Sequence, residues 1–151
     1  MISLEAFLSL SRLDGTYWAV ADLQIDQAIR SLFCKEAVLR VDKLELSGTQ
    51  AISQFFHDRK IQHDLAKRVT RHFSSGFDAV RVAEDVATAR YVVQVFAGTG
   101  DWPMPSAAPS TIADVEDVLV SDGTGGNFSG AVSHQYLSAS PQPVSRVDSF
   151  R

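Results

Sequence analysis

The chain has 151 residues, of which 45% are hydrophobic and 21% are charged, and its formal net charge is −4. This length and composition are typical of one soluble globular domain that buries a sizeable core. The acidic balance argues against a nucleic-acid partner, because such proteins normally present a basic stripe. The single cysteine, Cys34, excludes an intramolecular disulfide and a cysteine-based zinc site.

From the sequence we expect neither a membrane span nor a signal peptide. No run of about 20 apolar residues occurs, so we expect no membrane span. The opening segment, Met1 to Glu5, lacks a basic region and carries an early acid, unlike a signal peptide. We therefore expect a cytoplasmic protein.

Helices are predicted mainly in the first half of the chain. Apolar residues recur at helical steps over residues 3–24, and a second, short helix is expected over residues 26–33. Residues 37–46 alternate as in a half-buried strand, with a change of phase near Lys43 that indicates a bulge or a bend. Helical spacing returns at residue 51 and predicts a third helix that ends near residues 61–63.

The second half of the chain is predicted to consist of strands. They are expected at residues 68–75, 77–83, 86–97, 112–121 and 127–137. A loop rich in proline and glycine covers residues 98–111. Helices followed by antiparallel strands predict the α+β class, with three N-terminal helices packed on a curved, mainly antiparallel sheet. Residues 1–138 would form this cone-shaped domain around a pocket, and residues 139–151 would form a tail.

Three polar residues have the chemistry of a proton-transfer site. The imidazole of His72 can take a proton near neutral pH. The carboxylate of Asp22 can hold that imidazole in one tautomer, and the hydroxyl of Tyr17 can donate a hydrogen bond to a substrate oxygen. Together in a dry pocket they would form a site with no metal and no cofactor. The alternatives are a polar strand residue for His72, a helix cap for Asp22 and a core aromatic for Tyr17.

The order and spacing of these residues resemble a known family. The pattern consists of Tyr17, Asp22 and Asp26 in the first helices, Thr70 to Phe73 at the start of the antiparallel strands, and Asp114 to Gly123 near the last hairpin. Over residues 3–137 it is similar to the SnoaL-like branch of the nuclear transport factor 2-like superfamily. The resemblance implies the cystatin-like α+β cone.

The resemblance also implies an eliminating enzyme. Scytalone dehydratase, hexachlorocyclohexane dehydrochlorinase and bile-acid 7α-dehydratase in this superfamily are lyases that use an Asp–His pair. By this resemblance His72 takes a proton from carbon, Asp22 orients it, and a hydroxide or halide leaves. Tyr17 corresponds to the dehydratase tyrosine, which polarises or protonates an oxygen. The chain departs from scytalone dehydratase in lacking a second histidine near Val95 to Ala97.

Five further residues are assigned to the substrate pocket. They are Trp18, Phe55, Trp102, Asp114 and His134. Phe55 has the alternative of a simple core position, and Trp102 that of a dimer contact. Asp114 has the alternative of a cross-strand ion pair with Arg90.

These observations favour a cofactor-independent lyase that acts on a small hydrophobic or cyclic molecule. A ketosteroid-isomerase-like isomerase or polyketide cyclase is the first alternative, with an aspartate as general base. A non-catalytic ligand-binding or dimerisation module is the second, since a fold does not determine a function. Under all three we expect a homodimer through the outer face of the sheet, and neither a nucleic-acid nor a membrane partner.

Overall fold

The computed structural model describes residues 2–25, 29–105, 107–121 and 128–138, the last range by its backbone alone. The elements are α1 (Leu4–Ala21), a short 3₁₀ helix η1 (Ile29–Leu32), β1 (Phe33–Val41), β2 (Leu44–Ser47), α2 (Thr49–Ala66), β3 (Arg68–Ala83), β4 (Val86–Thr99), β5 (Thr111–Ser121) and β6 (Phe128–Ser138). The expected tail at residues 139–151 lies outside the described residues.

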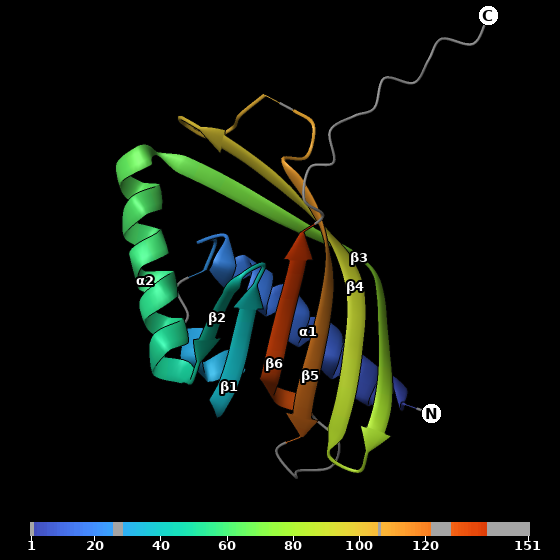
Figure 1. Ribbon diagram of the computed structural model, residues 1–151. Coiled ribbons are helices and arrows are strands. Elements are labelled where there is room, and N and C mark those ends of the chain that lie inside the picture. Colours follow the sequence, from blue (N-terminus) through green and yellow to red (C-terminus); the bar gives the residue numbers. More distant parts are fainter. Residues whose placement is uncertain (1, 26–28, 106, 122–127, 139–151) are drawn as a thin grey trace, which may run out of the picture.

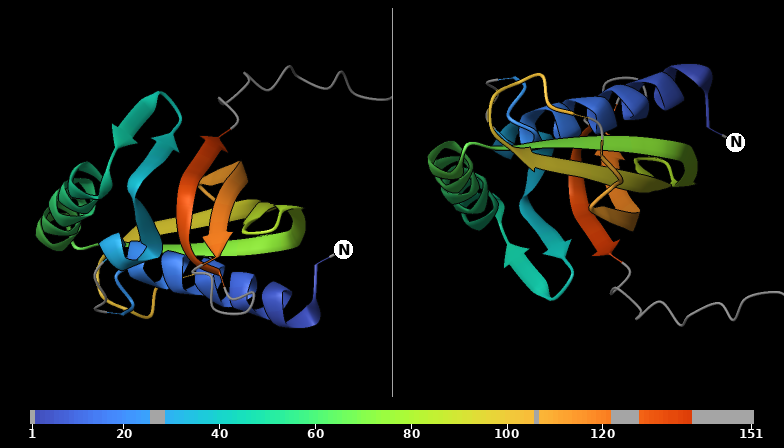
Figure 2. Two further views of the ribbon diagram at one scale, coloured as in Figure 1. Left: turned by 90° about the horizontal axis from the view of Figure 1, so that it is seen from below. Right: turned by 90° about the horizontal axis from the view of Figure 1, so that it is seen from above.

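A single curved sheet dominates the fold, and the predicted α+β class is confirmed. Its six described strands have the order β2-β1-β6-β5-β4-β3, and among them only the β1–β6 pair is parallel. Helix α1 runs along one face of the sheet, and α2 stands beside its β1–β2 end (Figures 1 and 2). The described part contains two α-helices and one 3₁₀ helix, so the expectation of three helices was too high by one. Of the short helix expected over residues 26–33, Ile29–Leu32 form η1, Phe33 already belongs to β1, and residues 26–28 lie outside the described residues.

Helix α1 begins and ends close to where the apolar spacing predicts. The hydroxyl of Ser3 accepts a hydrogen bond from the backbone N–H of Ala6 at 3.2 Å and so caps the first turn. The helix ends at Ala21, three residues before the predicted end, because Leu23 adopts a left-handed backbone with φ of 58°. Asp22 is therefore the C-terminal cap residue of α1.

Two expected irregularities have different forms in the structure. The change of phase near Lys43 is a tight turn between β1 and β2, in which Asp42 has a φ of 52°. The predicted strands at 68–75 and 77–83 are one strand, β3, with a register shift between Ser75 and Asp78. Gly76 has a φ of 68° within this bulge, a conformation that glycine adopts without steric cost.

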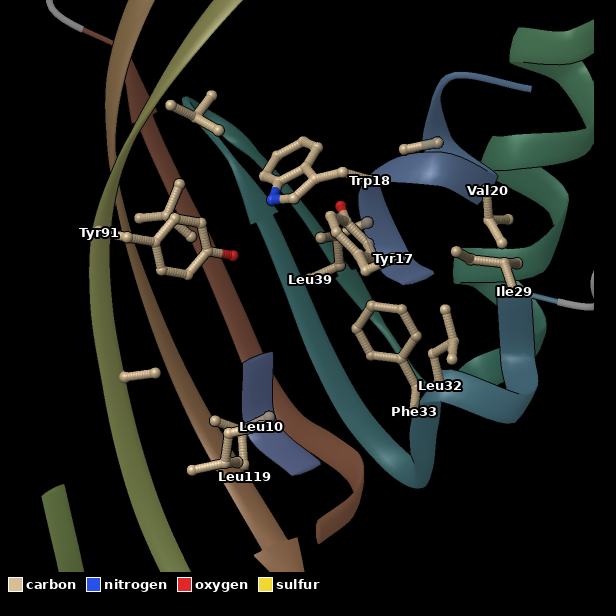
Figure 3. Packing of buried hydrophobic residues seen from close by; sticks show 14 of the residues in the cluster. Leu10, Tyr17, Trp18, Val20, Ile29, Leu32, Phe33, Leu39, Tyr91 and Leu119 are labelled. Atoms are coloured by element: carbon tan, nitrogen blue, oxygen red, sulfur yellow. The ribbon is translucent and has the colours of Figure 1, made fainter. Parts of the chain in front are cut away.

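The core fills the space between α1, α2 and the inner face of the sheet. Its largest fully buried side chains are Leu10, Leu39, Ile52 and Val93. Figure 3 shows Trp18 of α1 and Tyr91 of β4 reaching toward each other across this interior. The inner face thus carries polar groups among apolar ones, and those groups form the candidate site.

Candidate active site

Asp22 and His72 are in direct contact. Atom Nδ1 of His72 lies 2.6 Å from Oδ1 of Asp22, although the two residues are fifty positions apart in the chain. The side chains are 1% exposed for Asp22 and 10% exposed for His72. Asp22 lies at the C-terminal end of α1. Side chains of β3 point alternately to its two faces, and His72 lies on the face that meets Asp22.

Asp22 accepts hydrogen bonds from three donors. Oδ1 accepts from the hydroxyl of Thr70 at 2.8 Å as well as from the imidazole, and Oδ2 accepts from the backbone N–H of His72 at 2.6 Å. A carboxylate in this position favours the tautomer that has its proton on Nδ1. In the neutral ring, Nε2 is then the basic nitrogen.

These contacts lower the pKa of Asp22. Burial by itself raises the pKa of this carboxyl, but the hydrogen bonds and charge of His72 and the hydroxyl of Thr70 outweigh burial. Asp22 is therefore ionised at neutral pH. An ionised partner can stabilise an imidazolium that forms on His72 during a reaction.

An aromatic cavity of about 170 Å³ adjoins this pair. Its lining residues are Tyr17, Trp18, Ala21, Val41, Phe55, Phe56, Arg59 and His72. Trp18 stacks on the imidazole of His72, with ring centroids 4.4 Å apart. The edge of Tyr17 packs against Trp18 at 4.7 Å. The structure thus brings His72, Tyr17, Trp18 and Phe55 to one cavity, as expected from the sequence, with Asp22 directly behind the imidazole.

Arg59 and Thr70 belong to the same network but were not singled out from the sequence. The guanidinium of Arg59 donates to the carbonyl of Ala21 and, at 3.3 Å, to the hydroxyl of Thr70. Burial lowers the pKa of Arg59, while Asp22 and Tyr17 act in the opposite direction. The sequence did contain a pattern that could have indicated Arg59, because this charged residue follows Phe56 by three positions and so falls on the inward face of α2.

A second cluster of polar residues, which was not predicted from the sequence, lies on the inner face between α1 and the sheet. The hydroxyl of Tyr91 donates to Oδ2 of the buried Asp117 at 3.0 Å, and Ser74 donates to Oδ2 of Asp14 at 2.8 Å. Burial raises the pKa of Asp14, and the nearby charge of Asp117 raises it further. Hydrogen bonding by Ser74, Tyr91 and Trp18 partly opposes this rise. The pKa of Tyr91 is raised well above its usual value, first by burial and then by Asp117 and Asp14.

With this geometry established, similarity to known proteins is informative. Residues 3–126 match the family described as the SnoaL-like domain. The chain belongs to the SnoaL-like domain family. The family fits the nuclear transport factor 2-like superfamily that the sequence pattern resembles. No curated protein sequence matches this SnoaL-like domain.

Solved structures with the same fold include two from Streptomyces. Aln2 from a Streptomyces species is 15% identical with a TM-score of 0.73, covering 91% of this chain and 93% of its own. ActVI-ORFA from Streptomyces coelicolor is 18% identical with a TM-score of 0.73, covering 91% and 97%. A putative scytalone dehydratase from Novosphingobium aromaticivorans is 16% identical with a TM-score of 0.67, covering 89% and 84%. These likenesses show the fold, which another neighbour's description calls cystatin-like.

Two predicted pocket residues lie elsewhere in this SnoaL-like domain. Asp114 is exposed on the outer face of β5, because the buried positions of that strand alternate through Ala113 and Val115. Its predicted ion pair is also wrong, since Arg90 bonds Glu116 at 3.2 Å. The buried acid of β5 is Asp117, in phase with the apolar positions.

Trp102 lies outside the His72 cavity. Its side chain is 62% exposed, and the guanidinium of Arg71 lies 4.7 Å from its ring centroid. It borders a different hollow, next to the end of β4. The loop after β4 folds back beside that strand, because Met104 lies against Gly98 and Trp102 shares its hollow with Arg71.

His134 can be placed only by its backbone. It pairs in register with Asp117 of β5 and with Leu39 of β1. The side chain lies outside the described part of the structure, so its predicted role in the pocket stays a prediction.

Within the described ranges, no three His, Cys, Asp or Glu side chains come close enough to hold a metal ion. Neither described α-helix combines the length and the apolar run that crossing a lipid bilayer requires.

Proposed function

We propose that this SnoaL-like domain is a lyase that eliminates water or halide from a small, mostly apolar cyclic compound. The proposal depends on one observation, the 2.6 Å contact between His72 Nδ1 and Asp22 Oδ1 beside an aromatic cavity. His72 is the base and Asp22 is its orienting partner. The neighbour described as a putative scytalone dehydratase supports this type of reaction.

The proposed elimination uses side chains as acid and base. With Nδ1 occupied by Asp22, Nε2 of His72 takes a proton from a substrate carbon, and the C–H electron pair forms the new double bond. The bond to the leaving group on the adjacent carbon breaks with its electron pair on that group. A departing hydroxide takes its proton from the hydroxyl of Tyr17, whereas a halide needs none. Asp22 stabilises the imidazolium until the proton returns to solvent or to Tyr17.

The cavity size limits the substrate. Its volume is about 170 Å³, and an apolar cavity of about 150 Å³ is known to hold one benzene molecule. The part of the site described here therefore fits one six-membered ring. Aromatic walls from Trp18 and Phe55 favour a flat or partly unsaturated ring.

The direct test is dehydration of a one-ring cyclic β-hydroxyketone, followed by the ultraviolet absorbance of the conjugated product. We expect His72→Gln to lower kcat by about 10²- to 10⁴-fold, the usual contribution of a general base. His57→Gln is the matched control, because His57 is exposed on α2. Undiminished turnover by a folded His72→Gln protein, checked by circular dichroism, would remove the proposal.

The second polar group favours one alternative, an isomerase or polyketide cyclase. Asp14 has a raised pKa, and its carboxylate oxygen Oδ1 is buried beside Tyr91 and Trp18. A carboxyl group of this kind can move a proton between carbons. Solvent deuterium incorporated without loss of water or halide, and abolished by Asp14→Asn but not by His72→Gln, would favour this reaction over elimination.

We also propose that the protein forms a homodimer through the outer face of the sheet. This face carries exposed apolar side chains, including Phe73 and Ile112, which are 58% and 54% exposed. Light scattering at micromolar concentration should give twice the chain mass. A monomer under these conditions would contradict the dimer and leave the elimination proposal intact.

A further inference from the structure

Arg59 is a charged residue on the inward face of α2, where charged side chains are unusual. It lies on α2 three residues after Phe56 and seven after Ile52, both of which are buried. These spacings place all three on the face of the helix that points into the molecule. Charged side chains are rarely placed on such a face without a partner, because losing water costs the charged form several kcal/mol.

The contacts of Arg59 do not neutralise its charge. Its guanidinium donates to the carbonyl of Ala21 and to the hydroxyl of Thr70, both of which are neutral acceptors. Among the described residues, Arg59 takes part in none of the ion pairs. Asp22 favours the charged guanidinium from a distance, but Thr70 lies between the two groups, and the Asp22 oxygens already accept from Thr70 and His72. A guanidinium also has more N–H donors than these contacts use.

Arg59 and His72 line the same aromatic cavity. A ring packed against Trp18 or Phe55 would therefore have a base and a cation within the same small volume. A guanidinium presents paired N–H donors that match the two oxygens of a carboxylate. In a site from which water is largely excluded, this attraction is stronger than at a surface.

We propose that Arg59 recognises an anionic oxygen, carried as a carboxylate or phenolate on the one-ring compound that this cavity binds. The inference rests on the proposed function for the location of the site and adds the charge of the ligand. A ring that carries such an oxygen is held with its apolar edges against the aromatic walls and its charge against Arg59. A neutral ring of the same shape binds more weakly.

Benzoate and benzamide are suitable probes, because they have the same shape and differ in charge. Binding is followed by fluorescence in a Trp102→Phe background. Trp18 is then the only tryptophan of the chain, since the sequence contains two. Its ring lines the cavity, so a change in its emission reports occupation of this site.

We expect the Trp102→Phe protein to bind benzoate more tightly than benzamide. Adding Arg59→Gln should weaken benzoate binding by about tenfold or more, as for loss of a charge-assisted hydrogen bond, and should change benzamide binding by less than about threefold. Arg59→Lys should keep part of the preference. Arg68→Gln is the matched control, because Arg68 is exposed and its charge acts on Arg59 from nearby; it should keep the full preference.

Three results would overturn the inference. They are no benzoate binding at millimolar concentration, no preference for benzoate over benzamide, and an equal loss of both ligands in a folded Arg59→Gln protein. The last result would mean that Arg59 only supports the end of α1 through Ala21. The His72→Gln variant tests this inference apart from the proposed function. It should lose turnover but still bind benzoate more tightly than benzamide.

Discussion

The indole of Trp18 lies over the imidazole of His72, with ring centroids 4.4 Å apart and planes 20° from parallel. The same imidazole bonds Asp22 through Nδ1 at 2.6 Å. The stack restricts the tilt of the ring, and the hydrogen bond restricts its rotation about the Cβ–Cγ bond. His72 is thus held in one orientation before any ligand arrives, which is the arrangement that favours proton transfer.

Replacement of Trp18 by Leu should release this orientation. In the unmodified protein, we expect the ring current of the indole to shift the Cε1 proton of His72 upfield relative to that of the exposed His57. We expect Trp18→Leu to remove most of this difference in a ¹H–¹³C NMR spectrum. Trp18→Phe should keep part of it. An unchanged His72 signal in Trp18→Leu would show that the stack is absent in solution.

The Asp22 carboxylate should stabilise the fold in a pH-dependent way. Its pKa is lowered in the native state, so its contribution is complete above the unfolded value of about 3.9 and is lost as pH falls through the native pKa. We expect Asp22→Asn to lower the free energy of unfolding by about 2 kcal/mol at pH 7, because buried donors lose their charged acceptor. Urea titrations should show this difference shrinking below about pH 3.9; a pH-independent difference would contradict the assignment.

Asp14 should show the opposite dependence. Its pKa is raised in the native state, chiefly by burial, so ionisation favours the unfolded chain. As pH rises from about 3.9 through the native pKa, the unmodified protein should lose stability relative to Asp14→Asn. At pH 7 the variant should be the more stable of the two. Asp114→Asn is the control at an exposed position and should give no such trend.

The packing of the inner face can be tested with two leucines. Leu39 on β1 is 0% exposed, whereas Leu65 near the end of α2 is 82% exposed. Leu39→Ala should cost about 2–5 kcal/mol of unfolding free energy, because it leaves a cavity between α1 and the sheet. Leu65→Ala should change stability by less than about 0.5 kcal/mol. Comparable losses in both variants would contradict the observed core.

The elements with strong periodicity were predictable from the sequence. The limits of β4, β5 and β6 differ from the predicted limits by two residues or fewer. The short η1 was misassigned because helical spacing over so few residues is not distinctive. The single strand β3 was divided in two because Gly76 is normally a break, whereas here it forms a bulge within one strand.

The site was only partly predictable. Spacing carries no information on the distance between Asp22 and His72, and their pairing was inferred from the family pattern. On β5, Asp117 alternates in step with Val115 and Leu119, so the sequence pattern did predict a buried position for this acid. Asp114 was chosen from the sequence instead. Trp102 lies in an aperiodic loop, where no pattern indicates the direction of a side chain.

The contact between Asp22 and the backbone of His72 also concerns the edge of the sheet. Among the described strands β3 is the last in the sheet, so within that part of the chain one of its sides has no neighbouring strand. Open strand edges recruit strands from other molecules and so start aggregation. The carboxylate that orients the imidazole also occupies the N–H of His72 on β3. One side chain thereby both orients the imidazole and satisfies a backbone donor of the edge strand.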